Sequence, residues 1–273
     1  MIKTSESASS AAMTQAITKT VIVKAVAGVK TLPSPPKVYL QLNALLQEKN
    51  TDSQKFANII TQDPALAAKV LQFSNSSFLV NGKALTNITD AITKMGLDTL
   101  CCIVMTSELF SYKPDIENYS IVNEQLHSLA VARLAASLVK AELKQEAMLA
   151  GLLHDLGKIV LFEINPKLTQ TFFKHKEKAK DNIALEQKVF STDHCHISGY
   201  LLHTWNFSAS LIEAVVLHHS PEKLLRKSFG IAQATYVADQ LIHGQDLDES
   251  FVEHFKLAPL LEKLTARAAK LKG

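Results

Sequence analysis

Apolar residues recur along this chain at the three- and four-residue spacing that places them on one face of an α-helix. The segment Thr51–Gln54 has the form of a capping box and precedes one such apolar face. Asp63 and Pro64 combine an N-cap residue with a first-turn proline, which predicts another helix start. The apolar run Ile159–Phe162 is only four residues long and is too short to predict a strand between helical segments. The pattern therefore predicts an all-α protein.

Two breaks in the helical pattern divide the chain. The proline-rich segment Leu32–Pro36 follows an N-terminal helical stretch, and Tyr112–Asp115 precedes a long helical pattern that resumes near Ile121. The second lobe that results holds nearly all of the candidate chemistry. We expect an N-terminal helical extension over residues 1–30, a helical N-terminal lobe over residues 31–115, and a second helical lobe over residues 116–273.

The overall charge and the cysteine count exclude several classes of protein. The 273 residues carry 29 Lys and Arg against 26 Asp and Glu, and the basic residues are scattered, so we expect no nucleic-acid partner. No run approaches the roughly 18 apolar residues of a membrane span, and the N-terminus lacks an apolar core of signal-peptide length. The only cysteines are Cys101, Cys102 and Cys195, a sparse and odd count that favours a reducing compartment. The sequence thus predicts a soluble, cytoplasmic protein with no membrane partner.

The ten histidines are unevenly distributed, and none lies before position 127. Several stand beside a strongly apolar helical stripe, where burying an unpaired polar group costs about 2–7 kcal/mol. One such residue would ordinarily be a core histidine with a hydrogen-bond partner. Five predicted helices that each present such a group favour a shared centre, because the groups can then satisfy one another. The candidates are His127, the pair His154 and Asp155, His194, the pair His218 and His219, and Asp239.

The chemistry of these side chains points to metal binding. Neutral imidazole nitrogen and carboxylate oxygen are donors that suit iron, manganese and zinc. Seven candidate ligands exceed the needs of one ion and are enough for two ions with a bridging aspartate. The sequence therefore predicts two divalent ions of iron, manganese or zinc.

The order of these groups resembles that of a known family. His127, His154-Asp155 and Asp239 look like the H…HD…D pattern of the HD superfamily of metal-dependent phosphohydrolases, and His154–Lys158 matches the HDxGK form of its HD-GYP branch. Further segments, within roughly residues 30 to 240, are similar to the HDOD family, the HD-related output domain of bacterial signalling proteins. These segments are Leu32-Pro33, Pro35-Pro36, Ile59–Leu66, Leu71–Ser76, Ala91-Ile92, Met95-Gly96, His194–Gly199, Trp205 and His218–Pro221.

The chain departs from relatives of this superfamily at two places. HD-GYP proteins carry a Gly-Tyr-Pro signature after the histidine pair, whereas this chain reads Ser220-Pro221-Glu222, which argues against cyclic-di-GMP hydrolysis. Asn123 stands four residues before His127, where some relatives with three metals have a glutamate. Two ions are therefore a better prediction than three.

The resemblance implies a multi-helix HD-domain-like bundle with a helical N-terminal lobe packed against it. In such a bundle Asp155 would bridge the ions, and Lys158 would stabilise charge on a phosphate oxygen. The alternative for Lys158 is a cation at a helix C-terminus, favoured by the helix dipole. The expected ligands are His127, His154 and Asp239 for one ion, and His194, His218 and His219 for the other.

Two functions stay open at this point. The first is an HDOD-type signalling or regulatory protein whose metal site meets a phosphate-containing small ligand or a signalling protein. The alternative is an active metal-dependent phosphohydrolase acting on a nucleotide, cyclic dinucleotide or other phosphoester, which the complete ligand set and Lys158 favour. A purely structural metal is a weaker third possibility, and no oligomeric state is predicted. His243 lies among polar residues, and we expect it to be solvated.

Overall fold

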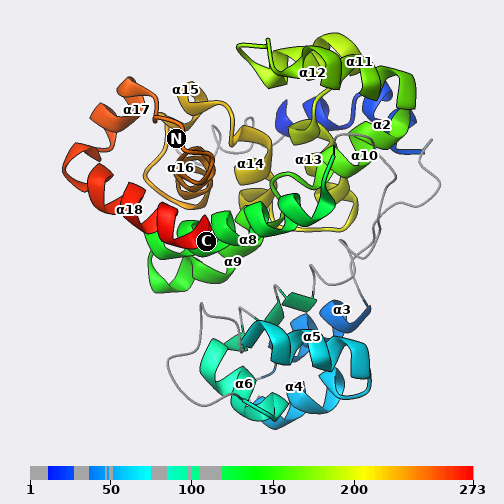
Figure 1. Ribbon diagram of the computed structural model, residues 1–273, viewed down its shortest axis with the longest axis vertical. Helices are drawn as coiled ribbons and strands as arrows, with labels where there is room; N and C mark the ends of the chain where they lie inside the picture. The colour runs from blue at the N-terminus through cyan, green and yellow to red at the C-terminus, as the bar shows by residue number, and fades with distance from the viewer. Residues whose placement is uncertain are drawn as a thin grey trace. The chain divides into compact units, whose positions relative to one another are not determined.

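The structure is a computed structural model, and it describes residues 12–27, 37–46, 48, 52–74, 85–97, 100–101, 103–104 and 119–272. Helices joined by loops and turns account for these ranges, with no strand among them, which confirms the all-α prediction. The chain divides into two compact units (Figure 1). The smaller unit is Pro33–Lys113, and the larger unit combines Met1–Leu32 with Pro114–Gly273.

Two helices of the smaller unit begin at the predicted polar segments, although the cap of the first is the second residue of the predicted capping box. Asp52 caps α4 (Ser53–Ile60) by accepting a hydrogen bond from a backbone N–H in the first turn. Asp63 accepts two such bonds at the start of α5 (Pro64–Ser74), whose first residue is the predicted proline. The unit also contains α3 (Lys37–Leu46) and α6 (Ile88–Met95), and its buried side chains include Tyr39, Leu42, Phe56, Ile60 and Ile92.

The larger unit is built from many short helices. With 18 residues α8 is the longest of the described helices, and none of them is both long and apolar enough to cross a bilayer. The elements are α2 (Thr20–Ala27), α8 (Ile121–Leu138), η1 (Ala141–Leu143), α9 (Lys144–Leu153), α10 (Leu156–Ile164), α11 (Pro166–Lys176), α12 (Asn182–Phe190), α13 (His194–Thr204), α14 (Ala209–Leu217), α15 (Pro221–Leu224), α16 (Ile231–His243), α17 (Glu249–His254), η2 (Ala258–Leu260) and α18 (Leu261–Lys272).

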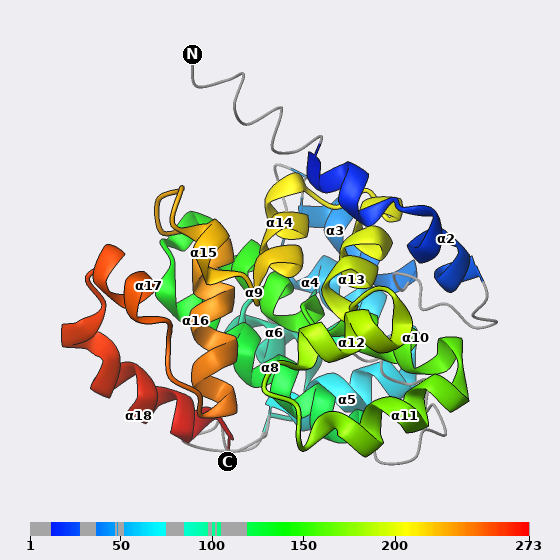
Figure 2. The same cartoon turned by 90° about the horizontal axis from the view of Figure 1, so that it is seen from above.

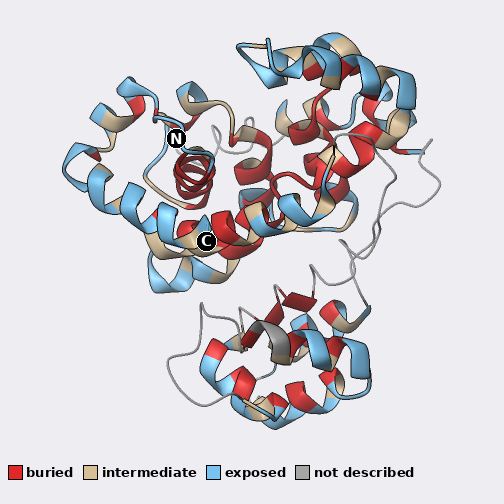
Figure 3. Ribbon diagram, viewed as in Figure 1, coloured by how far each residue is buried: buried red, intermediate tan, exposed pale blue. Residues whose placement is uncertain are grey.

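The centre of the larger unit is α16. Apart from Gln240, every residue of this helix from Ile231 to Ile242 is buried. Its residues are small or apolar almost all the way round, which is typical of a helix surrounded by other helices. It contacts α8, α9, α14 and α18, and Figure 3 shows it nearly end-on with its buried residues on every side.

Two glycines allow neighbouring helices to approach closely. A Cβ on Gly151, in α9, would lie 2.6 Å from the Cα of Ala132, in α8. A Cβ on Gly157, in α10, would lie 2.8 Å from the backbone N of Ser198, in α13, and closer still to the carbonyl oxygen of His194. Cβ atoms essentially never come within 3.0 Å of such atoms, so both helix contacts require glycine.

The N-terminal helices belong to the larger unit. A helix over residues 12–17 precedes α2, and α2 contacts α10 and α13 (Figure 2). Ile17, Ile22 and Val26 are buried, so this segment contributes apolar side chains to the core.

Candidate metal centre

Most of the candidate ligands stand at or next to the ends of helices in the larger unit, and two lie within helices. His154 follows the last residue of α9, and Asp155 stands between α9 and α10. His194 is the first residue of α13, and His218 follows the last residue of α14. Three further candidates complete the set: His127 within α8, His219 after His218, and Asp239 within α16.

The Asp155 carboxylate faces two groups of imidazoles, one with each oxygen. Its Oδ2 lies 3.1 Å from Nε2 of His154 and 3.7 Å from Nε2 of His127. Its Oδ1 lies 3.1 Å from Nε2 of His194 and 3.8 Å from Nε2 of His218. Side chains from separate helices therefore meet around this single buried carboxylate.

The Asp239 carboxylate closes the centre from α16. Its Oδ1 lies 3.0 Å from Nε2 of His127 and 3.4 Å from Nε2 of His154. Its Oδ2 lies 3.9 Å from Nδ1 of His219. The structure thus brings all seven candidate ligands into one cluster.

Hydrogen bonds at the outer ring nitrogens orient three of the imidazoles. Nδ1 of His154 donates to the carbonyl oxygen of Gly151 at 2.8 Å, and Nδ1 of His218 donates to that of Val215 at 2.6 Å. Nδ1 of His194 instead donates to Oε2 of Glu186 at 2.8 Å. With the proton fixed on Nδ1, each ring presents Nε2 to the centre, which is how a metal-binding histidine is ordinarily held.

Burial and charge shift the pKa values of the cluster in opposite directions. Burial lowers the pKa of His154, but Asp155 and Asp239 outweigh burial and raise it to about 10. Burial lowers the pKa of His219 to about 4, and the carboxylates do not compensate there. Burial raises the pKa of Asp239, but hydrogen bonds from His127 and His154 prevail and hold it well below its usual range. The two aspartates therefore act as a concentrated negative charge inside the protein.

The donor atoms fit divalent cations. Oδ1 of Asp155 and Oδ2 of Asp239 are buried and accept no hydrogen bond from any described residue. Buried carboxylate oxygens without partners are costly, and a cation placed between them and the facing imidazoles would satisfy them. Nitrogen and oxygen donors of this kind suit iron, manganese and zinc.

Lys158 joins the cluster from α10. Its Nζ lies 2.5 Å from Oδ2 of Asp155 and 3.7 Å from Oε2 of Glu124. Because α10 begins at Leu156, Lys158 occupies the first turn of a helix. The alternative of a cation at a helix C-terminus is therefore wrong, and the ion pair with Asp155 accounts for its position.

Two members of the centre lie outside the sequence prediction. Glu186, in α12, is buried and accepts hydrogen bonds from both the backbone N and Nδ1 of His194. His243, expected to be solvated, lies with Nδ1 2.9 Å from Oδ1 of Asp239, although its side chain stays 41% exposed. His243 was detectable from its spacing, since it stands four residues after Asp239 on one helix face. Glu186 carries no comparable signal.

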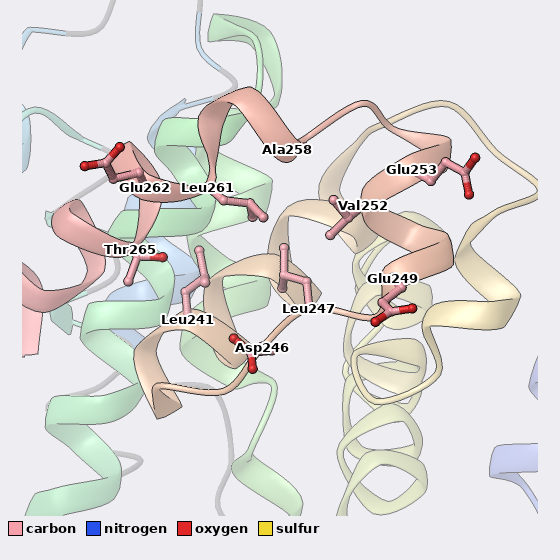
Figure 4. A pocket seen from close by; sticks show the side chains of 10 residues that line it. All are labelled: Leu241, Asp246, Leu247, Glu249, Val252, Glu253, Ala258, Leu261, Glu262 and Thr265. Carbon is pink, nitrogen blue, oxygen red and sulfur yellow. The ribbon is translucent and has the colours of Figure 1, made fainter.

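A separate cavity of about 600 Å³ lies between α16, α17 and α18 (Figure 4). Leu241, Leu247 and Leu261 point into it, while Glu253 and Glu262 lie at its margin. Leu241 is two residues beyond Asp239 and so projects about 200° around the helix from it. This cavity therefore lies on the other face of α16 and is not part of the centre.

The chain matches a protein-family model and a curated protein. The family model of the HDOD domain matches residues 32–221, well over half of the chain, and leaves Asp239 and His243 beyond its end. A curated protein of Treponema pallidum (strain Nichols) without an assigned function is 24% identical over 202 residues. That match covers 69% of this chain but 38% of the relative, so this chain spans much less than the whole length of that protein.

Solved structures share the fold. An HDOD domain protein of unknown function from Geobacter sulfurreducens superposes with a TM-score of 0.71 at 21% identity, over 92% of this chain and 97% of that chain. A protein from Shewanella amazonensis SB2B, described as a candidate phosphohydrolase, superposes with a TM-score of 0.72 at 21% identity, over 93% and 95% of the two chains. At this level of identity the likeness shows a common fold alone.

Proposed function

This chain belongs to the HDOD family, and from that premise we propose that it acts in signalling by binding a phosphate-bearing small ligand at a centre of two divalent cations. The concentration of the ligand would reflect a metabolic or signalling state, and a partner protein would recognise the ligand-bound form. Binding at a metal centre is common to both functions that the sequence leaves open.

The position of the Asp155 carboxylate is the observation that supports this proposal. Its two oxygens each lie 3.1 Å from an imidazole Nε2, that of His154 on one side and that of His194 on the other. An aspartate that faces two sets of nitrogen donors is arranged to bridge two cations. Asp239 adds a second buried negative charge. Two divalent cations would more than balance the charges of both carboxylates.

We assign the ligands to two positions that share Asp155. The first position comprises His127, His154 and Asp239 with Oδ2 of Asp155. The second comprises His194, His218 and His219 with Oδ1 of Asp155. When bound, such cations polarise a phosphoryl oxygen and lower the pKa of a coordinated water.

Hydrolysis of the bound phosphoester is the second candidate function, and Lys158 favours it. Burial lowers the pKa of Lys158, but Asp155 and Glu124 outweigh burial and raise it well above its usual range. Lys158 therefore keeps its positive charge beside the bridging carboxylate. A fixed cation there can attract a phosphate oxygen and stabilise negative charge that develops during attack. The candidate phosphohydrolase of the same fold is consistent with such chemistry.

Metal analysis and phosphate binding test the proposal on the full chain. The wild type, Asp155→Ala and a control, Lys94→Ala, are loaded with iron, manganese or zinc, dialysed and analysed for bound metal. Lys94 is an exposed cation on α6 of the smaller unit, so its loss leaves the centre intact. Inorganic phosphate is then titrated calorimetrically into loaded and metal-free protein, and hydrolysis of bis(p-nitrophenyl) phosphate and cyclic dinucleotides is followed.

We expect the wild type and Lys94→Ala to bind two cations per chain, and to bind phosphate only when loaded. Asp155→Ala should lose both properties. A wild type that holds no cation after dialysis, or binds phosphate equally well without one, refutes the proposal. If the wild type and Lys94→Ala hydrolyse a substrate and Asp155→Ala does not, the protein is a phosphohydrolase. If the loaded wild type binds phosphate without turnover, the signalling function by ligand binding is supported.

A further inference from the structure

Cys195 lies beside the second cation position. It is the second residue of α13, directly after His194, and it is only 3% exposed. Its Sγ lies 3.6 Å from Nε2 of His194, the ring nitrogen that faces Asp155. A buried cysteine is ordinarily a small apolar side chain. Here the sulfur instead contacts a nitrogen that faces the metal centre.

Four donor atoms gather at this place. One ligand atom from each of His194, Cys195, His218 and His219 lies within 4.8 Å of the other three. A single cation at bonding distance from several ligands requires such mutual separations, since metal–nitrogen and metal–sulfur bonds are about 2.0–2.3 Å long. The sulfur thus lies within the spread of donors that one ion can gather.

A buried oxygen with no hydrogen bond points to an ion at the same place. Oδ1 of Asp155, on a side chain that is 3% exposed, has no hydrogen-bond partner among the described residues, although it lies 3.1 Å from Nε2 of His194. It also lies 3.8 Å from Nε2 of His218. The oxygen and the two imidazoles therefore face a region where a positive charge would satisfy them, and the thiol contacts one of these imidazoles.

His194 and Cys195 are the first two residues of α13. Asp193 caps the helix by accepting a hydrogen bond from the backbone N of His196, so His194 and Cys195 both lie in the first turn. The side chain of Ser198, one turn further on, bonds to the backbone of Gly157 and of His154, which holds this turn against α10.

We propose that Cys195 is a thiolate ligand of the second cation, so that the two positions of the centre have different chemistry. This inference rests on the proposed two-cation centre. The first position offers nitrogen and oxygen donors only, and the second adds sulfur. As the sulfur–metal bond forms, the thiol proton leaves to solvent. Thiolate is a soft donor, so the second position should prefer zinc or iron over manganese more strongly than the first does.

Cobalt substitution tests this directly on the full chain. Co²⁺ bound by thiolate shows an intense near-ultraviolet sulfur-to-cobalt charge-transfer band, which nitrogen and oxygen ligands do not produce. The wild type, Cys195→Ser and a Cys101→Ser/Cys102→Ser double variant are titrated with Co²⁺, with bound cobalt counted after dialysis. The double variant is the matched control, because it removes the other two cysteines of the sequence and leaves Cys195 in place.

We expect the wild type and the double variant to develop the band as the second equivalent of cobalt binds. Cys195→Ser should lack the band, keep the first equivalent, and bind the second at least tenfold more weakly. Two equivalents bound by the wild type without a sulfur band would overturn the thiolate ligand alone. A band that persists in Cys195→Ser would also overturn it. If the wild type binds no cobalt, the two-cation centre fails as well. The absence of the band from the wild type is decisive by itself, so the proposal can fail even if a variant does not fold.

Discussion

Replacing Gly157 with alanine should disrupt the contact between α10 and α13 that positions Asp155 against His194. The added Cβ would lie 2.8 Å from the backbone N of Ser198 and 2.9 Å from the carbonyl carbon of His194, with the carbonyl oxygen nearer still. All three neighbours are backbone atoms, so no change of side-chain rotamer can relieve the overlap. The two helices must move apart. Overpacking of this kind typically lowers the free energy of unfolding by about 1–3 kcal/mol.

The same displacement reaches the centre through two neighbouring residues. Asp155 immediately precedes α10, and His194 is the first residue of α13. Moving the helices apart therefore separates Oδ1 of Asp155 from Nε2 of His194. Ligand positions at a metal must be correct to about 0.2 Å. We expect the second cation to bind at least tenfold more weakly, a loss of about 1.4 kcal/mol.

Calorimetric titration of zinc and thermal unfolding, both on the full chain, measure these two effects. Gly230→Ala is the control, because a Cβ there would lie 3.7 Å from its nearest neighbour, an ordinary contact, at the start of α16. This control should bind both cations with wild-type affinity. If Gly157→Ala matched the wild type in both affinity and unfolding temperature, the close approach of α10 and α13 would not be what positions Asp155.

Three further changes test other parts of the centre. Glu186→Gln removes the charge that holds Nδ1 of His194. Metal analysis should show about 10- to 100-fold weaker binding of one cation. The control Glu177→Gln, at an exposed position, should leave binding unchanged. Lys158→Met removes an ammonium group that lies 2.5 Å from Asp155, so the amount of bound metal should be retained or increased. Any hydrolysis should fall at least tenfold. A parallel loss of metal would contradict a role of Lys158 in charge stabilisation. Removal of the cations with a chelator should lower the free energy of unfolding. The loss is about 2.7 kcal/mol for each site that was held at a free cation concentration of 100 Kd. Identical denaturant midpoints before and after chelation would argue against cation binding by the native state.

Much of the fold and of the centre was predictable from the pattern of residues. Local signals suffice for two helix starts: Asp63 caps α5 as predicted, and α4 begins within the predicted capping segment, although its cap is Asp52 and not the first residue of that segment. The convergence of the candidate ligands followed from a physical argument about burial. Polar groups on several apolar helices must find partners, and His127, Asp155 and Asp239 find one another.

The remainder depended on packing that no local pattern records. Glu186 reaches His194 because α12 ends at Phe190 and the chain turns back through Ser191, which has a left-handed backbone with φ of 62°. Sequence separation gives no hint that the carboxylate would point inward. Cys195 is similar, since its nearness to the cluster depends on the rotation of α13. Both residues contact His194, so local reasoning predicted the residues that cluster better than it predicted their neighbours on α12 and α13.

The imidazoles assigned to the two proposed cation positions are not all held in the same way, and this difference predicts which position empties first. His154 and His218 are each oriented by a carbonyl three residues earlier on their own helix, Gly151 and Val215 respectively. Such local bonds persist as long as each helix does. His194 is oriented by Glu186 from a different helix, and its distance to Asp155 depends on the glycine contact between α10 and α13. The second proposed position thus depends on contacts among α10, α12 and α13. Substitutions at Gly157 or Glu186 should therefore empty it before the first position, whose ligands other than Asp155 lie on α8, on α16 and at the end of α9.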